Sequence, residues 1–290
     1  MTTTEHQLTW IITGATRGFG RSIAEDALRR GDSVLAAVRS PDALADLASS
    51  YPRRLATVAF DARDVGGVPA VVAAATERFG RIDVLVNNAG RGYVGAAEEI
   101  PDAELRESLE LHFLVPAALT RAVLPVMRSQ RNGTIIQMSS QGGRMAFPGV
   151  GAYCAGKFAL EGWTEALAGE VAPFGVRVML VEPSRFRTGF NAPDVLTVAE
   201  IDEAYRDILA AVRSDMRVSD GAQEGDPDKA AAVIGDLVRS GELPLRLPLG
   251  GEAVRRIGAA YRSNLASLDE YAELAAGTDY ADAVASVRPI

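Results

Sequence analysis

The sequence predicts one α/β domain spanning residues 1–290, with a doubly wound parallel sheet of about seven strands, helices on both faces and a helical C-terminal cap. Short apolar runs alternate with longer amphipathic stretches, which is typical of repeated strand–helix–strand units. The runs are nearly continuous in Val, Ile and Leu, as in strands covered on both faces. No linker, repeat or low-complexity segment divides the chain, so one domain is favoured although the length would also allow two.

Six apolar runs predict strands in chain order. They are Leu8–Thr13, Ser33–Val38, Leu55–Phe60, Ile82–Val86, Gly133–Met138 and Val176–Val181. A seventh run, Leu243–Leu249, is a weaker candidate because Pro244 and Pro248 bracket it.

Amphipathic stretches between these runs predict the helices. Leu105, Leu109 and Phe113 recur at intervals of four residues, which indicates one apolar face of a long helix ending near Ser129. Ser40-Pro41 places a cap residue before a proline at the first helical position of another helix. Further helices are expected at Arg17–Arg30, Ala152–Ala172, Thr197–Ser214, Pro227–Arg239 and Gly251–Ala275.

The regular alternation weakens after the sixth strand. We expect residues 185–290 to contribute a substrate lid over the carboxyl edge of the sheet and a C-terminal helical extension. This region belongs to the same domain in that interpretation, because no linker separates it from the strands.

The composition excludes several functional classes. The net charge is −8 and no basic block is present, so nucleic-acid binding is not expected. One cysteine, Cys154, excludes a disulfide framework, and the two histidines, His6 and His112, are too far apart to suggest a metal site. No apolar run approaches the ~20 residues that span a bilayer. The polar N-terminus, Met1–Gln7, has no signal-peptide core, so we expect a cytoplasmic protein without membrane contact.

The first predicted strand runs into a glycine-rich turn. Gly14, Gly18 and Gly20 lie where a strand must turn into a helix, and backbone without Cβ atoms can approach a phosphate at the helix N-terminus. We therefore expect a dinucleotide on this turn, although glycines also gather in ordinary tight turns. The expected contacts are Gly14, Thr16, Arg17, Gly18, Phe19 and Gly20.

The ends of the next strands favour NADP(H) over NAD(H). The second strand ends Val38-Arg39-Ser40 without the carboxylate that usually binds the ribose of NAD, and Arg39 with Arg17 could hold a 2′-phosphate. Both arginines could equally be solvated surface residues, so NAD(H) stays an alternative. Asp61 is a candidate for contact with adenine or for helix capping, and Asn88, Ala89 and Gly90 are expected near the nicotinamide ribose or in a plain turn.

One of only two lysines stands four residues after a tyrosine. Tyr153 and Lys157 share one face of a predicted helix, whereas the other basic residues are 28 arginines and Lys229. A phenol is a poor acid or base at neutral pH, and a nearby cation is expected to lower its pKa. Lysine can also pass on a proton, which arginine cannot. Ser140 follows the fifth strand and would face the same cleft, where it could bind a substrate oxygen or act as a turn serine.

These motifs resemble the short-chain dehydrogenase/reductase family, with its Rossmann-like fold. The order of the glycine turn, Asn87–Gly90, Ser140, Tyr153-x-x-x-Lys157 and Pro183 to Thr188 matches the family strongly over residues 8–190 and loosely beyond. The sequence after Tyr153 looks like the branch with 17β-hydroxysteroid dehydrogenases and related ketoreductases.

The resemblance implies a mechanism. Tyr153 would exchange a proton with the substrate oxygen, Lys157 would lower the tyrosine pKa and hold the nicotinamide ribose, and Ser140 would polarise the carbonyl. Pro183 and Thr188 would contact the cofactor. The resemblance also implies a homodimer or homotetramer, paired through the long helix and the helix that carries the tyrosine.

Two positions depart from the family pattern. His112 stands where the family usually has an asparagine in the proton relay, and we expect either that it replaces this residue or that it is a packed histidine bonded to backbone. Ser184 follows Pro183 where glycine is common, which puts the backbone conformation of that loop in doubt.

The substrate is expected to be a small carbonyl or alcohol compound with apolar character. The loops around the cleft carry Tyr93, Met145, Phe147, Phe186 and Phe190, which favour a hydrophobic ketone or alcohol. Arg91, Arg144 and Arg185 would instead suit an acidic substrate. An epimerase or dehydratase, or a non-catalytic NADP-binding sensor, are the alternatives to an oxidoreductase on the same scaffold.

Overall fold

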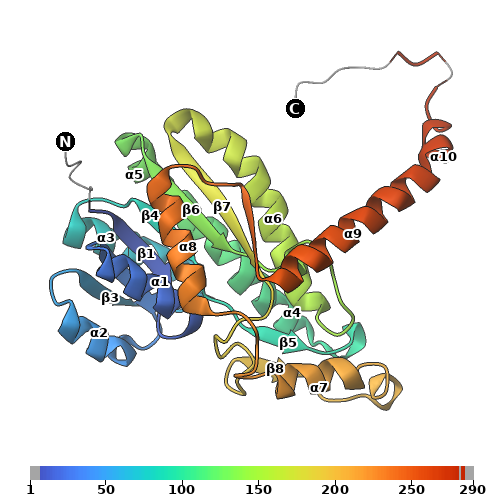
Figure 1. Cartoon of the computed structure of the whole chain (residues 1–290), viewed down its shortest axis with the longest axis horizontal. Coiled ribbons are helices and arrows are strands. Elements are labelled where there is room, and N and C mark those ends of the chain that lie inside the picture. Colours follow the sequence, from blue (N-terminus) through green and yellow to red (C-terminus); the bar gives the residue numbers. More distant parts are fainter. Residues whose placement is uncertain (1–6, 281, 285–290) are drawn as a thin grey trace.

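A seven-stranded parallel sheet forms the centre of the computed structural model, which describes residues 7–280 and 282–284 (Figure 1). Its strand order is β3-β2-β1-β4-β6-β7-β9, so the chain winds outward in both directions from β1, as predicted. The strands are β1 (Thr9–Thr13), β2 (Ser33–Val38), β3 (Leu55–Ala59), β4 (Val84–Asn87), β6 (Gly133–Met138), β7 (Val176–Pro183) and β9 (Arg246–Leu249). The predicted N-terminal segment Met1–Gln7 lies outside the described residues except for Gln7.

Helices cover both faces of this sheet. One face packs against α1 (Gly18–Arg29), α2 (Ala45–Ser50) and α8 (Pro227–Ser240). The other face packs against α3 (Val68–Phe79), α5 (Val115–Gln130) and α6 (Gly151–Val171). Neighbouring strand residues alternate between the two cores, as Ile11 and Ile12 do, which explains why the strands read as continuous apolar runs.

The outermost strand β3 departs from that pattern. Only Leu55 is buried, and the following residues alternate between partly buried and exposed positions, so the prediction that all six strands are buried on both faces is wrong for this one. β3 pairs only with β2, and an edge strand keeps less cover from helices.

Two helix predictions are also corrected. The stretch Thr197–Ser214 is not one helix: it contains β8 (Leu196–Val198), a 3-10 turn over Glu203–Tyr205 and the start of α7 (Ala210–Val218). β8 pairs with β5 (Gly92–Val94) in a small parallel sheet, a contact between segments about 100 residues apart in sequence. Near Ser40, a 3-10 turn over Pro41–Leu44 precedes α2, and the Ser40 side chain forms no cap bond.

The long helix is continuous but irregular. It consists of α4 (Asp102–Leu109), a π-helical turn over Glu110–Leu114, and α5. The span Asp102–Gln130 is long and apolar enough to cross a membrane by length and composition, a property that buried core helices share.

The region after residue 185 divides into three parts. The segment that contains β8 and α7 lies across the carboxyl edge of the sheet, whereas α8 packs on α1 and β9 completes the sheet. Of the three parts, the first is the one that lies over this edge, and its role as a substrate lid stays a prediction. The helices α9 (Gly251–Glu270) and α10 (Ala272–Ala276) extend away from the body (Figure 1).

Candidate active site

A cavity of about 540 Å³ opens at the carboxyl edge of the sheet. This is where ligands bind in open α/β sheets. Every residue proposed from the sequence as catalytic or cofactor-binding, except Gly20, contributes to its lining: Gly14, Thr16, Arg17, Gly18, Phe19, Arg39, Asp61, Asn88, Ala89, Gly90, His112, Ser140, Tyr153, Lys157, Pro183 and Thr188.

The glycine-rich turn is packed too closely for side chains at two positions. Gly18 has φ +55°, and a Cβ atom there would lie 2.7 Å from Thr188. A Cβ atom on Gly20 would lie 2.4 Å from the Gly14 carbonyl oxygen, which also accepts a hydrogen bond from Asn88 at 3.2 Å. Gly20 thus does not line the cavity, but its lack of a side chain allows the close packing of the turn.

The N-terminus of α1 suits a phosphate group. No side chain caps this helix end, and its first turn carries no acidic residue. Free N–H groups and the positive end of the helix dipole therefore face the cavity beside glycines that let a ligand approach the backbone. The residues present fit the pyrophosphate of a dinucleotide.

Two arginines and one aspartate lie at the end of the cavity next to β2. Arg39 forms no ion pair with another described residue, whereas Arg17 pairs with Asp194 at 2.8 Å in an exposed position. Asp61 binds the Arg63 guanidinium at 2.6 Å and the Arg63 N–H at 3.0 Å. Its carboxylate thus holds a neighbouring loop residue, and Arg63 holds the pKa of Asp61 below its usual value.

Ser140, Tyr153 and Lys157 meet between β6 and α6. The Ser140 Oγ accepts the Gly142 N–H at 3.0 Å, and the Ser140 hydroxyl also hydrogen-bonds the Tyr153 side chain. The Lys157 Nζ donates to the Met138 carbonyl at 2.6 Å and lies 5.7 Å from the Tyr153 ring centre. Helical spacing places Tyr153 and Lys157 on one face, as predicted.

The acid–base properties of this group differ from the expectation. Burial raises the pKa of Tyr153 to about 12, and a hydrogen bond with Ser140 opposes the shift. Burial lowers the pKa of Lys157 to about 8, and the nearby Glu161 carboxylate opposes this shift. Loss of solvent around the phenol is the largest effect on the pKa of Tyr153, and the lowering of this pKa by Lys157 stays a prediction.

His112 lies in the π-helical turn and faces the tyrosine. It is 1% exposed, and its ring contacts the Tyr153 ring edge-on with centres 5.1 Å apart. The Nε2 atom lies 3.0 Å from the Arg91 carbonyl, which can only accept, so Nε2 carries the hydrogen and Nδ1 is an acceptor. Nδ1 is buried and has no protein partner. Burial and the charge of Lys157 lower the pKa of His112 well below its usual value, so the ring is neutral at pH 7.

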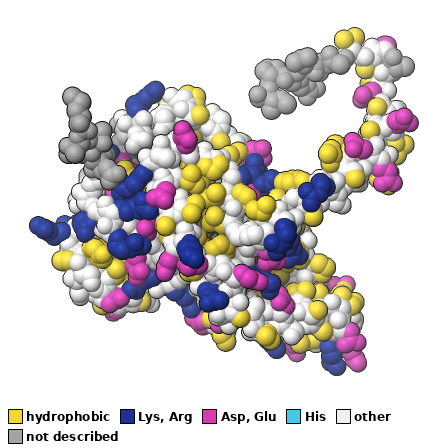
Figure 2. Space-filling view, viewed as in Figure 1, with side chains coloured by type: hydrophobic (Ala, Val, Ile, Leu, Met, Phe, Trp, Pro, Cys, Tyr) yellow, Lys and Arg dark blue, Asp and Glu magenta, His cyan; other side chains and the backbone are white. Residues whose placement is uncertain are grey.

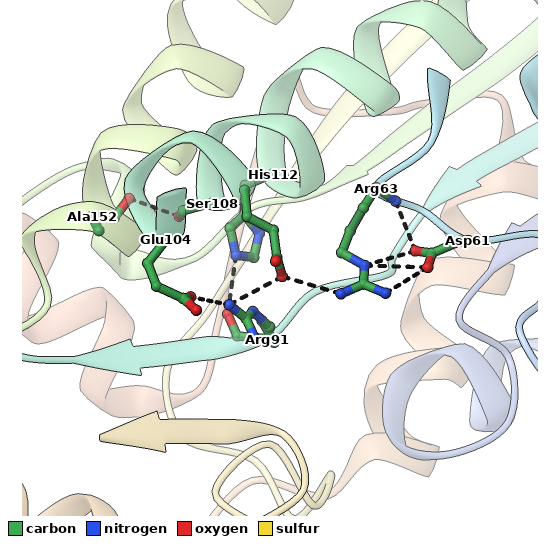
Figure 3. A network of polar contacts seen from close by, with 8 residues as sticks. Asp61, Arg63, Arg91, Glu104, Ser108, His112 and Ala152 are labelled. Atoms are coloured by element: carbon green, nitrogen blue, oxygen red, sulfur yellow. Dashed lines mark hydrogen bonds and ion pairs between the residues drawn. The ribbon is translucent and has the colours of Figure 1, made fainter. Parts of the chain in front are cut away.

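A network of charges connects His112 with the rim of the cavity (Figure 3). The Arg91 side chain binds Glu104 and Glu107, while its carbonyl contacts His112. Glu107 also pairs with Arg63, which in turn binds Asp61. π-helical turns occur frequently at functional sites, and here the turn holds His112 between Arg91 and Tyr153.

Apolar side chains form the far wall of the cavity. Of the five residues predicted around the cleft, all but Met145 line it, and Phe190 packs edge-on against Tyr153 with ring centres 5.7 Å apart. Sequence reasoning missed further apolar lining residues, among them Leu111, Val150, Val195 and Met216. Val195 and Met216 flank a segment that was predicted to be one helix. Because that prediction was wrong, the sequence did not place these two residues at the cavity.

The three arginines considered for an acidic substrate are already paired. Arg91 binds two glutamates as described above, and Arg144 pairs with buried Glu182 at 2.5 Å. Arg185 binds Asp215 at 2.9 Å and Glu252 at 3.3 Å. Their charges are neutralised, which argues against an acidic substrate.

A buried ion pair holds the segment over the cavity. Arg213 of α7 binds Glu99 at 2.6 Å, and the two side chains are 6% and 2% exposed. Glu99 also accepts the N–H groups of Ala96 and Asp202 at 2.7 and 2.9 Å. These bonds fix the cover, including Met216, to the turn after β5.

The loop after β7 accommodates serine without strain. Among the described residues, Arg131 is the only non-glycine with positive φ, so Ser184 does not adopt the left-handed conformation. Its Oγ donates to the Leu249 carbonyl at 3.3 Å, and its N–H does so at 2.9 Å. Serine thus fastens this loop to β9.

Comparisons with known proteins agree with this geometry. The family model for short chain dehydrogenases matches residues 9–198. An oxidoreductase of Botryotinia fuckeliana, BOA17, is 38% identical over 91% of this chain and 97% of its own. A 3-ketodihydrosphingosine reductase of Bacteroides thetaiotaomicron is 34% identical over 83% of this chain and 87% of its own.

A solved structure is similar over nearly the whole length. A short-chain dehydrogenase from Streptomyces avermitilis superposes with a TM-score of 0.89 at 44% identity, covering 95% of this chain and all of that one. The family model alone covers more than half of the chain. The chain is therefore an oxidoreductase that belongs to the short-chain dehydrogenase/reductase family.

Proposed function

We propose that this protein reduces the carbonyl group of a small hydrophobic substrate with NADPH, with Tyr153 as the proton donor. The observation that carries the proposal is the meeting of Ser140, Tyr153 and Lys157 in the same cavity as the glycine-rich turn. A bound nicotinamide cofactor supplies the hydride, and the protein supplies position and the proton.

The protonation state of the tyrosine supports reduction. A phenol with a pKa of about 12 is fully protonated at neutral pH, so it enters the reaction as an acid. Ser140, which hydrogen-bonds the Tyr153 side chain, donates to the carbonyl oxygen of the bound substrate in this proposal and orients it. Lys157, buried and mostly charged below pH 8, stabilises the phenolate left after proton transfer.

His112 takes part in restoring the proton in this proposal. Its neutral ring lies against Tyr153, and its Nδ1 is an unpaired acceptor inside the cavity wall. Buried acceptors usually have partners, so a water bound between Nδ1 and the lysine–tyrosine pair is the arrangement that satisfies it. In the alternative role, His112 only packs in the core and donates to the Arg91 carbonyl, and its Nδ1 accepts no hydrogen bond.

Arg39 is the residue that favours NADP(H) over NAD(H). It lines the cavity at the end of β2 and has no ion-pair partner in the described part of the chain. No carboxylate in β2 is placed to bind a ribose 2′-hydroxyl. Arg39 interacts electrostatically with Asp61 and Asp194 without a direct ion pair, and the 2′-phosphate would bind it directly, with Arg17 able to leave its exposed pair with Asp194.

The shape of the cavity favours a ketone with an apolar body. Aromatic and aliphatic side chains form the wall opposite the glycine turn, and the arginines nearby are paired. The related 3-ketodihydrosphingosine reductase takes its name from a long-chain ketone. We expect lipid-like or polycyclic ketones to be better substrates than charged ones.

A tyrosine variant tests the proposal. Tyr153→Phe should bind NADPH normally but lose turnover with a panel of hydrophobic ketones, measured by NADPH fluorescence. Tyr280→Phe, at a tyrosine that is 87% exposed, is the matched control and should keep full activity. Turnover that survives in Tyr153→Phe would refute the assignment. Wild-type protein without cofactor turnover on any ketone would favour a non-redox enzyme or a sensor.

A further inference from the structure

The helices α9 and α10 form an arm that contacts the body at its base, where Arg256 lies over the Phe147 ring and Arg144 over the Tyr261 ring. Ala253 and Ile257 at its base are buried, but every residue from 261 to 280 is exposed. Figure 1 shows the arm extending away from the sheet and its helices. An isolated helix of this length is marginal in water, because packing supplies most helical stability in proteins. We therefore expect the arm to be stabilised by packing against another molecule.

One side of the arm carries a regular apolar seam. Its residues are separated by four and three positions in alternation, the spacing of a coiled coil. On α9 the seam consists of Val254, Gly258, Tyr261, Leu265 and Leu268, and Ala272 and Ala275 follow on α10 after a break at Tyr271. The largest members are far from buried: Leu265 is 58% and Leu268 is 68% exposed. Scattered single apolar residues are common on surfaces, but a continuous heptad seam indicates a contact with another helix.

The charges along the arm identify that other helix. The first half carries Arg255, Arg256 and Arg262, of which Arg256 is paired with Glu252, and the second half carries Asp269, Glu270 and Glu273. Figure 2 shows basic side chains at the root of the arm and acidic ones toward its end. The arm is thus complementary to itself only when a second copy runs in the opposite direction. A parallel second copy would place like charges together.

We propose that the arm pairs antiparallel with the same arm of a second copy of this chain, around a twofold axis between Leu265 and Leu268. In this register Leu265 packs on the partner subunit's Leu268, and Arg262 lies beside the partner subunit's Asp269. Arg262 and Asp269 are seven residues apart, on the same flank of the seam. Helix α9 from 251 to 270 is about 30 Å long at 1.5 Å per residue, so an antiparallel pair places the two bodies at opposite ends. This pairing differs from the one that the family resemblance implies, which uses the long helix and the tyrosine helix.

The molar mass in solution tests the pairing. Light scattering coupled to gel filtration should give half the wild-type mass for Leu265→Asp/Leu268→Asp, with the dissociation constant raised at least about a hundredfold, since two buried leucines per arm are lost. Val233→Asp on α8, a residue 42% exposed, is the control and should keep the wild-type mass. Unchanged NADPH binding by both variants would show that the bodies remain folded.

Charge exchange tests direction and register. Arg262→Asp and Asp269→Arg should each weaken association about tenfold, and the double exchange should restore it, because each copy again meets its opposite charge. The two residues are too far apart within one helix to contact each other, so restoration requires a second copy. A monomeric wild type, an unchanged mass in the leucine variant, or no restoration in the double exchange would overturn the proposal. Retention of the wild type on lipid vesicles, with no dimer in solution, would assign the seam to a membrane and overturn it as well.

Discussion

Replacing Arg213 with methionine should loosen the segment that covers the cavity and destabilise the fold. Arg213 and Glu99 are 6% and 2% exposed, so the variant leaves a carboxylate buried without its cation. Removing one partner of a buried pair typically costs about 3–5 kcal/mol, against about 0–1 kcal/mol for an exposed pair. At roughly 2–4 °C per kcal/mol for a chain of this size, the midpoint of thermal unfolding should fall by about 6–20 °C.

The Arg213→Met variant should also bind its substrate more weakly. Met216 lies one turn after Arg213 on α7 and forms part of the cavity wall. The KM for a hydrophobic ketone should therefore rise in Arg213→Met while NADPH affinity changes little, since the glycine turn lies elsewhere. Calorimetry and steady-state kinetics measure the two effects separately.

Two control variants make this prediction specific. Asp215→Asn removes the exposed partner of Arg185, a side chain 59% exposed, and should shift the midpoint by no more than about 4 °C. The double variant Glu99→Gln/Arg213→Met leaves no buried charge and should recover most of the lost stability, because Gln keeps acceptors for Ala96 and Asp202. A double variant as unstable as the sum of its single changes would refute the reasoning.

Three further predictions follow from the site. The value of kcat/KM should fall as pH rises through about 8, because Lys157 loses its charge there. The free energy of unfolding should instead rise between pH 8 and 10.5, because the unfolded chain binds more protons than the folded protein in that window. The Lys157→Met variant should abolish both trends. His112→Asn should retain turnover and His112→Ala should lose it, with equal rates for both variants excluding a relay role. Arg39→Gln should weaken NADPH binding about tenfold to a hundredfold by fluorescence titration and leave NADH binding unchanged, whereas equal losses for both cofactors would contradict the 2′-phosphate assignment.

The strands of the sheet could be predicted because burial imposes a simple composition on them. A parallel strand between two helical layers must be apolar on both faces, so Ile11 and Ile12 are both required. The same reasoning failed for β3, whose position at the edge depends on the order of the strands and not on its own residues. It failed again for Leu196–Val198, which form a strand only because Gly92–Val94 lie beside them.

The residues of the candidate site could be predicted from the sequence, but their pKa values and ion-pair partners could not. The spacing of Tyr153 and Lys157 gives a shared helix face, yet the pKa of the tyrosine depends on burial beneath residues such as Phe190 that lie on distant segments. Arg144 looked free in the sequence because Glu182, its partner, is 38 residues away on another strand. Pairings of this kind follow from the tertiary fold alone.

The two lysines show how composition and structure combine. Lys229 has a side chain 86% exposed, 3.8 Å from Asp226, a position where arginine would serve equally. Lys157 is buried, and its ammonium group donates to the Met138 carbonyl beside Tyr153. Arginine would bring five donors that need partners in this enclosed space, and it would keep its proton at every physiological pH. A group with a pKa of about 8 can instead lose and regain a proton near neutrality, which explains why a chain built with arginine retains lysine at this position.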